Sequence, residues 1–150
     1  MLLPKGVTGF SDGNGFSAGV ELRDVTALAH LAARLSGGRV GAVSGPGVTP
    51  NFYSAEIITV DQVVLVIVNQ VHPLVAVAGR ITVGAMVFRN GSDQLKQAVE
   101  LTPPFRLLST LELNRPLIGS DLADLADPER AQVRYWQPER VGDVIFNYWD

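Results

Sequence analysis

The stretch QVVLVIVNQVHPLVAVAG, residues 62–79, decides the fold class, because it is long, apolar and free of formal charge. Its length is close to the minimum for a membrane-spanning helix. Asn69, Gln70, His72 and Pro73 interrupt it in the middle, however, and the runs on both sides are dominated by β-branched residues. Two short apolar runs around a polar break predict two buried β-strands, not a membrane helix.

Further strands are expected before and after this stretch. Apolar and polar residues alternate over residues 53–57, which is typical of a half-buried strand. Additional extended segments are predicted at residues 39–43, 81–88 and 105–113. The central part of the chain is therefore expected to be mainly β-structure.

Helices are expected outside this central region. Apolar residues recur at helical spacing between Asp24, a plausible N-cap, and the pair Gly37-Gly38, which is typical of a helix end. Ser92-Asp93 is a second helix start. Two more are Ser120, expected to cap a short helix that reaches residue 125, and Asp127-Pro128-Glu129, with proline in the first turn.

The last residues, from Pro138 onward, form either a helix or a strand. In a helix, one buried face would contain Val141, Val144, Ile145, Tyr148 and Trp149. The polar residues Asp143, Asn147 and Asp150 would then point away from the core. We expect this segment to pack into the core in either case.

Together these patterns predict one α+β domain over residues 1–150. Its central sheet is expected to be mostly antiparallel, with helices near the two ends of the chain. A length of 150 residues fits one domain, and 47% hydrophobic against 18% charged residues argues against disorder.

The composition excludes several kinds of chemistry. A chain without cysteine has no disulfide, thiolate metal site or cysteine nucleophile. Two histidines are poor material for a zinc site, and we expect no metal and no cofactor. The formal net charge of −3 and the lack of a Lys/Arg run disfavour nucleic acid as a partner. Residues 1–6 do not resemble a signal peptide, so a cytoplasmic protein is expected.

Two glycine-containing loops lack the residues that known ligand loops require. Residues 13–19 are rich in glycine, but no expected strand leads into them, so we interpret them as a loop and not as a dinucleotide site. Ser44-Gly45-Pro46-Gly47 lacks the lysine of a phosphate loop and the first glycine of a nucleophile elbow. His72 is either a general base or a turn residue, and we favour the turn.

Two classes of function stay open: a non-enzymatic protein-binding domain, and a small enzyme or ligand-binding domain. The second class would need a pocket. This pocket would lie near His72 and the Ser44–Gly47 loop. We favour a non-enzymatic protein, because no set of residues in the sequence marks a catalytic site.

The C-terminal third contains two further candidates for binding. The first is the acidic group Asp121, Asp124, Asp127 and Glu129, which is either a solvated helix face or a docking site for a basic partner. The second is the group of aromatic residues Tyr135, Trp136, Phe146, Tyr148 and Trp149. We expect most of these rings in the core, and any ring that remains outside is a potential interface anchor.

Both ends of the chain resemble a group of small bacterial proteins of uncharacterised function. The similar residues are Tyr135-Trp136-Gln137-Pro138, the ending RVGDVIFNYWD at residues 140–150, and LPKGVTGF at residues 3–10. In size and character these proteins are similar to immunity proteins, which neutralise toxins of competing bacteria. The resemblance implies a protein partner, in the form of a basic toxin domain, and it implies no catalytic residues.

Homo-oligomer formation is a further alternative to a toxin partner, because the apolar content of the chain is high.

Overall fold

The structure of the protein, a computed structural model, describes residues 1–10, 19–82 and 85–150, without the side chains of residues 80–82 and 85. The elements follow one another in the order α1 (Leu22–Leu35), β1 (Arg39–Ser44), β2 (Phe52–Ile58), β3 (Val63–Asn69), β4 (Leu74–Thr82), β5 (Ala85–Arg89), α2 (Asp93–Glu100), β6 (Arg106–Leu107), α3 (Thr110–Leu113), the 3-10 helix η1 (Gly119–Leu122), α4 (Asp127–Trp136) and α5 (Val141–Ile145).

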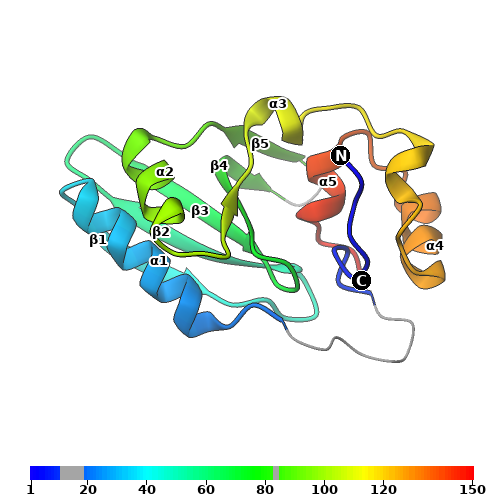
Figure 1. The fold of residues 1–150 in the computed structure, drawn as a ribbon, viewed down its shortest axis with the longest axis horizontal. Helices are drawn as coiled ribbons and strands as arrows, with labels where there is room; N and C mark the ends of the chain where they lie inside the picture. The colour runs from blue at the N-terminus through cyan, green and yellow to red at the C-terminus, as the bar shows by residue number, and fades with distance from the viewer. Residues whose placement is uncertain (11–18, 83–84) are drawn as a thin grey trace.

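The structure confirms the predicted fold class, an α+β domain with a mostly antiparallel sheet (Figure 1). Within the described residues it has six strands, with β1 to β5 in sequence order and each antiparallel to its neighbour. The short strand β6 pairs with the first residues of β4 in parallel. Short connections between consecutive strands produce this order, because antiparallel neighbours need only a hairpin.

The stretch at residues 62–79 forms the two predicted strands, β3 and β4. The polar break between them is a turn that one asparagine organises. Asn69 Oδ1 accepts hydrogen bonds from the backbone N–H groups of Val71 and His72, both at 2.9 Å. Among the described residues, no helix is long and apolar enough to cross a membrane.

One face of the sheet is covered by α1 and α2. Their buried side chains are apolar and pack against the β-branched residues of the central strands, such as Val66 and Val77. α1 also contacts β1 and β2. Because this face is packed almost entirely by apolar side chains, apolar periodicity together with the helix-end signals predicted both helices.

The opposite face is covered by the two terminal segments of the chain. Figure 1 shows the N-terminal segment and α5 side by side near one end of the molecule. Leu3 and Val7 are buried there together with Val141, Val144 and Ile145. The terminal segments are therefore part of the core, as expected for residues from Pro138 onward.

The C-terminal segment combines the two predicted alternatives. It is helical in α5 and then extended from Phe146 (φ −123°, ψ 100°). Tyr148 and Trp149 are only partly buried. The expectation that Asn147 points away from the core is wrong, because its side chain is 4% exposed and hydrogen-bonded inside the protein.

Several predicted boundaries are also wrong. α1 begins at Leu22 after Glu21, so Asp24 lies in its first turn and is not its N-cap. The short helix near Ser120 is the 3-10 helix η1, which follows Ile118 and ends at Leu122. β4 extends to Thr82, so the predicted strand at residues 81–88 is divided between β4 and β5.

Residues 105–113 are mostly not extended. Only Arg106–Leu107 is a strand, and Ser109 then starts α3. Ser109 and Glu112 form a capping box, in which each side chain accepts from the backbone N–H of the other residue. Of the glycine-rich loop predicted at residues 13–19, residues 13–18 lie outside the described part of the chain.

Candidate functional site

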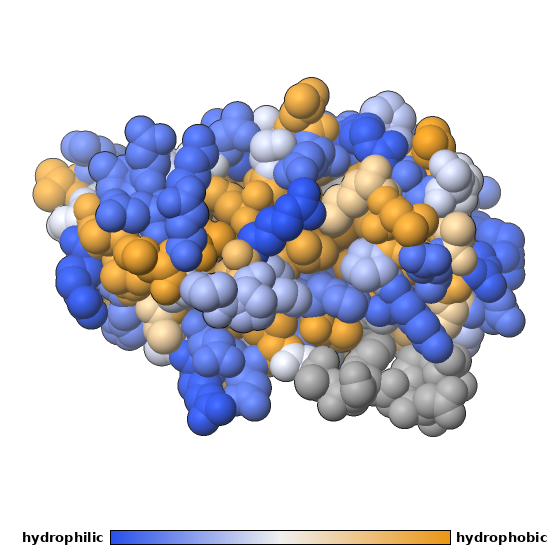
Figure 2. All heavy atoms as spheres, viewed as in Figure 1, coloured by the Kyte–Doolittle hydropathy of each residue, from blue (hydrophilic) through white to orange (hydrophobic). Residues whose placement is uncertain are grey.

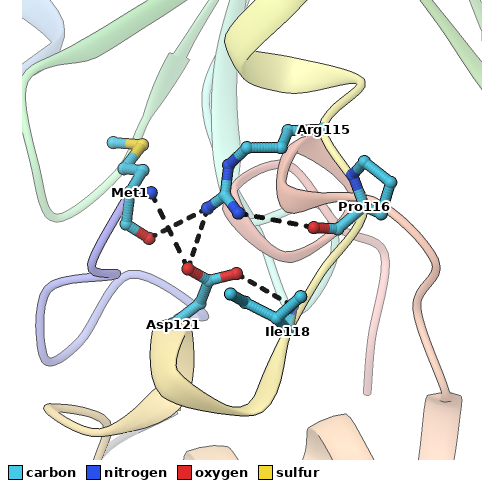
Figure 3. A network of polar contacts seen from close by, with 5 residues as sticks. All are labelled: Met1, Arg115, Pro116, Ile118 and Asp121. Carbon is cyan, nitrogen blue, oxygen red and sulfur yellow. Dashed lines mark hydrogen bonds and ion pairs between the residues drawn. The ribbon is translucent and has the colours of Figure 1, made fainter.

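Asp121, the first of the four acidic candidates, is buried in a polar network (Figure 3). Its Oδ1 accepts a hydrogen bond from Arg115 Nη2 at 2.8 Å and lies 3.7 Å from the amino group of Met1. Its Oδ2 accepts from the backbone N–H of Ile118 at 2.9 Å. Burial raises the pKa of Asp121, but these hydrogen bonds and positive charges outweigh burial and lower the pKa below its ordinary value.

Glu129 is completely buried, although it carries a carboxylate. Its Oε1 accepts from the backbone N–H groups of Gly6 at 2.8 Å and Ala126 at 3.1 Å. Its Oε2 accepts from the backbone N–H of Thr8 at 3.1 Å and from the Thr8 hydroxyl at 2.6 Å. Glu129 therefore fastens the start of α4 to the N-terminal segment, and it is not available to a partner.

Asp124 and Asp127 are exposed. Asp127 forms an ion pair with Arg130 one turn later in α4. η1 and α4 are separate helices, as the two helix starts predict, and only Asp124 and Asp127 of the four carboxylates face solvent. The four residues therefore do not form one solvated helix face. Binding of a partner to Asp124 and Asp127 stays a prediction.

The largest exposed aromatic side chains lie at the end of α4. Tyr135 is 77% exposed and Trp136 is 41% exposed. The Trp136 ring is stacked on the Trp149 ring, with centroids 6.5 Å apart and planes 2° from parallel. The Tyr135 ring meets Trp136 edge to face at 5.2 Å. We call Tyr135, Trp136 and Trp149 the ring surface.

The ring surface is held in place from two sides. Trp136 Nε1 donates to Gln132 Oε1 at 3.0 Å, which fixes the indole along α4. The backbone N–H of Trp149 donates to the buried Asn147 Oδ1 at 3.2 Å, and Trp149 packs on the core. Gln137 ends α4 in the left-handed conformation (φ 51°), which turns the chain directly after Trp136. Trp136 and Trp149 are thus each held by a hydrogen bond and by their mutual stack.

Three buried asparagines join the chain ends to the sheet, a role that was not predicted for any of them. Asn69 was expected only in a polar break and Asn147 was expected to point away from the core. Asn51 Nδ2 donates to the backbone oxygens of Val7 and Ile145, both at 3.0 Å. Asn69 Nδ2 donates to the same two oxygens at 2.8 Å. Asn51 Oδ1 accepts from the backbone N–H of Asn147 at 2.8 Å.

Arg140 organises the residues before α5 in a similar way. It binds Asp143 through Nε at 3.0 Å and Nη2 at 2.6 Å. It also donates to the backbone oxygen of Met86 and to Asn114 Oδ1, and its guanidinium lies 5.0 Å from the centre of the Phe88 ring. Arg140 and Asp143 of the RVGDVIFNYWD ending are therefore structural, and its ring Trp149 belongs to the ring surface.

His72 occupies a structural position. Its Nε2 lies 2.7 Å from the backbone oxygen of Lys5, so the ring joins the β3–β4 turn to the N-terminal segment. The favoured interpretation of His72 as a turn residue agrees with this contact. A pocket formed by His72 and the Ser44–Gly47 loop is not among the pockets described below.

Among the pockets on the surface of the described residues are three with volumes of about 410–480 Å³. The first lies between α1, the β3–β4 turn and the loop after α2, and the second between α2 and β6. The third pocket lies beside α3. Figure 2 shows hydrophobic residues at the surface on the face of the molecule that carries α1 and α2. None of the three is lined by His72 or by the Ser44–Gly47 loop.

In the part of the chain that the structure describes, no group of three or more His, Asp or Glu residues is placed to hold a metal ion. No protein-family model matches the chain, and comparisons with curated proteins and with solved structures find no match either. The candidate site therefore rests on geometry alone, and the ring surface is its most exposed aromatic feature.

Proposed function

We propose that the protein is a non-enzymatic, cytoplasmic protein-binding domain of the immunity type, which binds and inhibits a bacterial toxin. The observation that carries the protein-binding part is the ring surface. Tyrosine and tryptophan are the residue types most enriched among interface residues that dominate binding energy. The immunity part of the proposal is supported by the resemblance of the two chain ends.

The exposure of the rings favours binding over packing as their role. A buried aromatic ring removes about 150–250 Å² from water. Tyr135, at 77% exposure, keeps most of its ring in solvent, although its neighbour Val133 in α4 is buried. A partner that covers Tyr135 and Trp136 gains this burial.

Because the ring of Trp136 is already held in one conformation, we expect a higher affinity for a partner. Immobilising a flexible side chain on binding costs about 0.5–1.5 kcal/mol. Trp136 is already held by Gln132 and by its stack on Trp149. A partner therefore meets a surface whose conformational entropy is already reduced.

Partner capture with matched variants tests this function. The immobilised protein captures toxin domains from culture supernatants of toxin-secreting bacteria, and mass spectrometry identifies them. Tyr135→Ala combined with Trp136→Leu is expected to lose the captured toxin domain, whereas the control Leu111→Ala is expected to retain it. Leu111 is 85% exposed and lies in α3, outside the ring surface. Equal capture by all three proteins would refute the ring surface as the binding site, and capture of no toxin domain by the wild type would refute the immunity function.

A further inference from the structure

Two unpaired carboxylates are close in sequence to the residues of the ring surface. Glu139 follows Trp136 by three residues and Asp150 follows Trp149 directly, and both residues are exposed. Within the described residues, neither carboxylate forms a hydrogen bond or an ion pair. Asp124 in the segment before α4 is exposed and unpaired in the same sense.

Two of the three arginines in this part of the chain form ion pairs with carboxylates of the same chain. Arg130 pairs with Asp127 in α4. Arg140 pairs with Asp143, at 2.6 Å between Nη2 and Oδ1. Arg134 is exposed and adds one positive charge to this region. Three free carboxylates against this one arginine leave an excess of negative charge among the exposed residues of the C-terminal third.

Aromatic rings reinforce this preference for positive charge. The face of an indole or phenol ring carries partial negative charge, so it attracts a cation within about 6 Å of its centre. Arginine suits such a surface best, because its planar guanidinium stacks on a ring and donates hydrogen bonds to carboxylates at its edge. Tyr135 and Trp136 offer the ring faces, and Glu139 and Asp150 offer the acceptors.

From this combination we infer that the ring surface binds an arginine-bearing segment of the partner protein. The inference rests on the proposed function and names the chemistry of the partner at this site. The guanidinium stacks on Tyr135 or Trp136, and the flanking carboxylates accept its hydrogen bonds. This site differs from the acidic group expected from the sequence, because Asp121 and Glu129 are buried and take no part.

A pair of peptides isolates the contribution of the charge. The first is a capped Gly-Arg-Gly-Arg-Gly peptide, and the second has citrulline, the neutral isostere of arginine, at both positions. The readout is the pair of indole N–H resonances of Trp136 and Trp149 during titration of the intact protein. The arginine peptide is expected to shift both resonances and to bind at least about five-fold more tightly than the citrulline peptide, with a smaller difference at high salt.

Matched variants localise the effect. Glu139→Gln with Asp150→Asn is expected to weaken the arginine peptide at least about three-fold and to leave the citrulline peptide unchanged. Asp61→Asn, an exposed carboxylate in the turn between β2 and β3, is the control and should change neither.

The outcomes separate this inference from the proposed function. Equal binding of both peptides, or no shift with either, would overturn the preference for arginine, and ring-dependent toxin capture would still support the proposed function. Selective binding of the arginine peptide together with failed toxin capture would support this inference and refute the immunity function.

Discussion

Glu129 and Tyr135 lie less than two turns apart in α4, yet Glu129 is completely buried and Tyr135 is 77% exposed. The carboxylate, which is the more strongly hydrated group, is inside because four N–H and O–H donors of the N-terminal segment and the α4 start surround it. The aromatic ring is outside. Residue type alone would place them the other way round, and this contrast defines two sides of the C-terminal third.

The inner side consists of Glu129, Arg140 and Asn147, and the outer side consists of the ring surface with Asp124, Glu139 and Asp150. On the inner side, each polar group is matched by protein donors or acceptors, which is the condition for burying it without loss of stability. On the outer side, rings and carboxylates face solvent. The comparison predicts that substitutions on the inner side lower the free energy of unfolding, and that substitutions on the outer side lower the affinity for a partner.

Glu129→Ala is expected to have the largest effect. It leaves the N–H groups of Gly6, Thr8 and Ala126 and the Thr8 hydroxyl without their acceptor in a buried site. The free energy of unfolding should fall by about 3–5 kcal/mol, as measured by urea unfolding. Asp124→Ala, on the outer side, should change it by less than about 0.5 kcal/mol. Similar values for the two variants would remove the distinction between the sides.

Gly142→Ala is expected to be the next most destabilising change. A Cβ atom at this position would lie 2.5 Å from Phe88 Cε2 and 2.9 Å from the backbone oxygen of Leu113. Overpacking of this kind costs about 1–3 kcal/mol. Gly119→Ala is the matched control, because nothing lies within 4 Å of its Cβ position. If Gly142→Ala unfolds at the same urea concentration as wild type, Gly142 of α5 does not lie as close to Phe88 of β5 as the structure places it.

The pH dependence of stability should reveal the ionised state of Asp121. Its folded pKa is lower than its ordinary value of 3.8, so the folded state binds its proton less readily than the unfolded state. The stabilisation is complete above about pH 3.8 and is lost as pH falls through the folded pKa. The difference in free energy of unfolding between wild type and the Asp121→Asn variant should therefore become smaller below that pH. A difference that stays constant from pH 6 to pH 2 would show that the carboxylate is not stabilised in its charged form.

The fold could be predicted from sequence where apolar side chains determine the structure. The stretch at residues 62–79 and the apolar positions of α1 and α2 have periodicities that need no knowledge of distant residues. The asparagine contacts could not be predicted in this way. The Nδ2 atoms of Asn51 and Asn69 bind backbone oxygens at Val7 and Ile145, which are 44 to 94 residues away. Backbone acceptors carry no sequence signature.

One missed element did have a signal. Ser109 and Glu112 have the spacing of a capping box, which predicts a helix start, but the apolar residues around them favoured a strand. For the candidate site, the sequence predicted one acidic group of four residues from their charge. The structure divides this group, because Asp121 and Glu129 are buried. The exposed pair Tyr135 and Trp136 was anticipated only as aromatic residues of which one or two remain outside the core.

The most direct test of the two-sided account measures folding and binding in the same variant. Tyr135→Ala with Trp136→Leu removes two ring faces of the outer side, and leucine still covers Trp149. Two aromatic pairs are lost, Tyr135–Trp136 and Trp136–Trp149, and each is worth about 0.5–1.5 kcal/mol. The account predicts that the free energy of unfolding falls by about 1–3 kcal/mol, less than for Glu129→Ala, and that affinity for the captured toxin domain falls at least about ten-fold. A loss of stability as large as that of Glu129→Ala, with affinity for the partner unchanged, would contradict it.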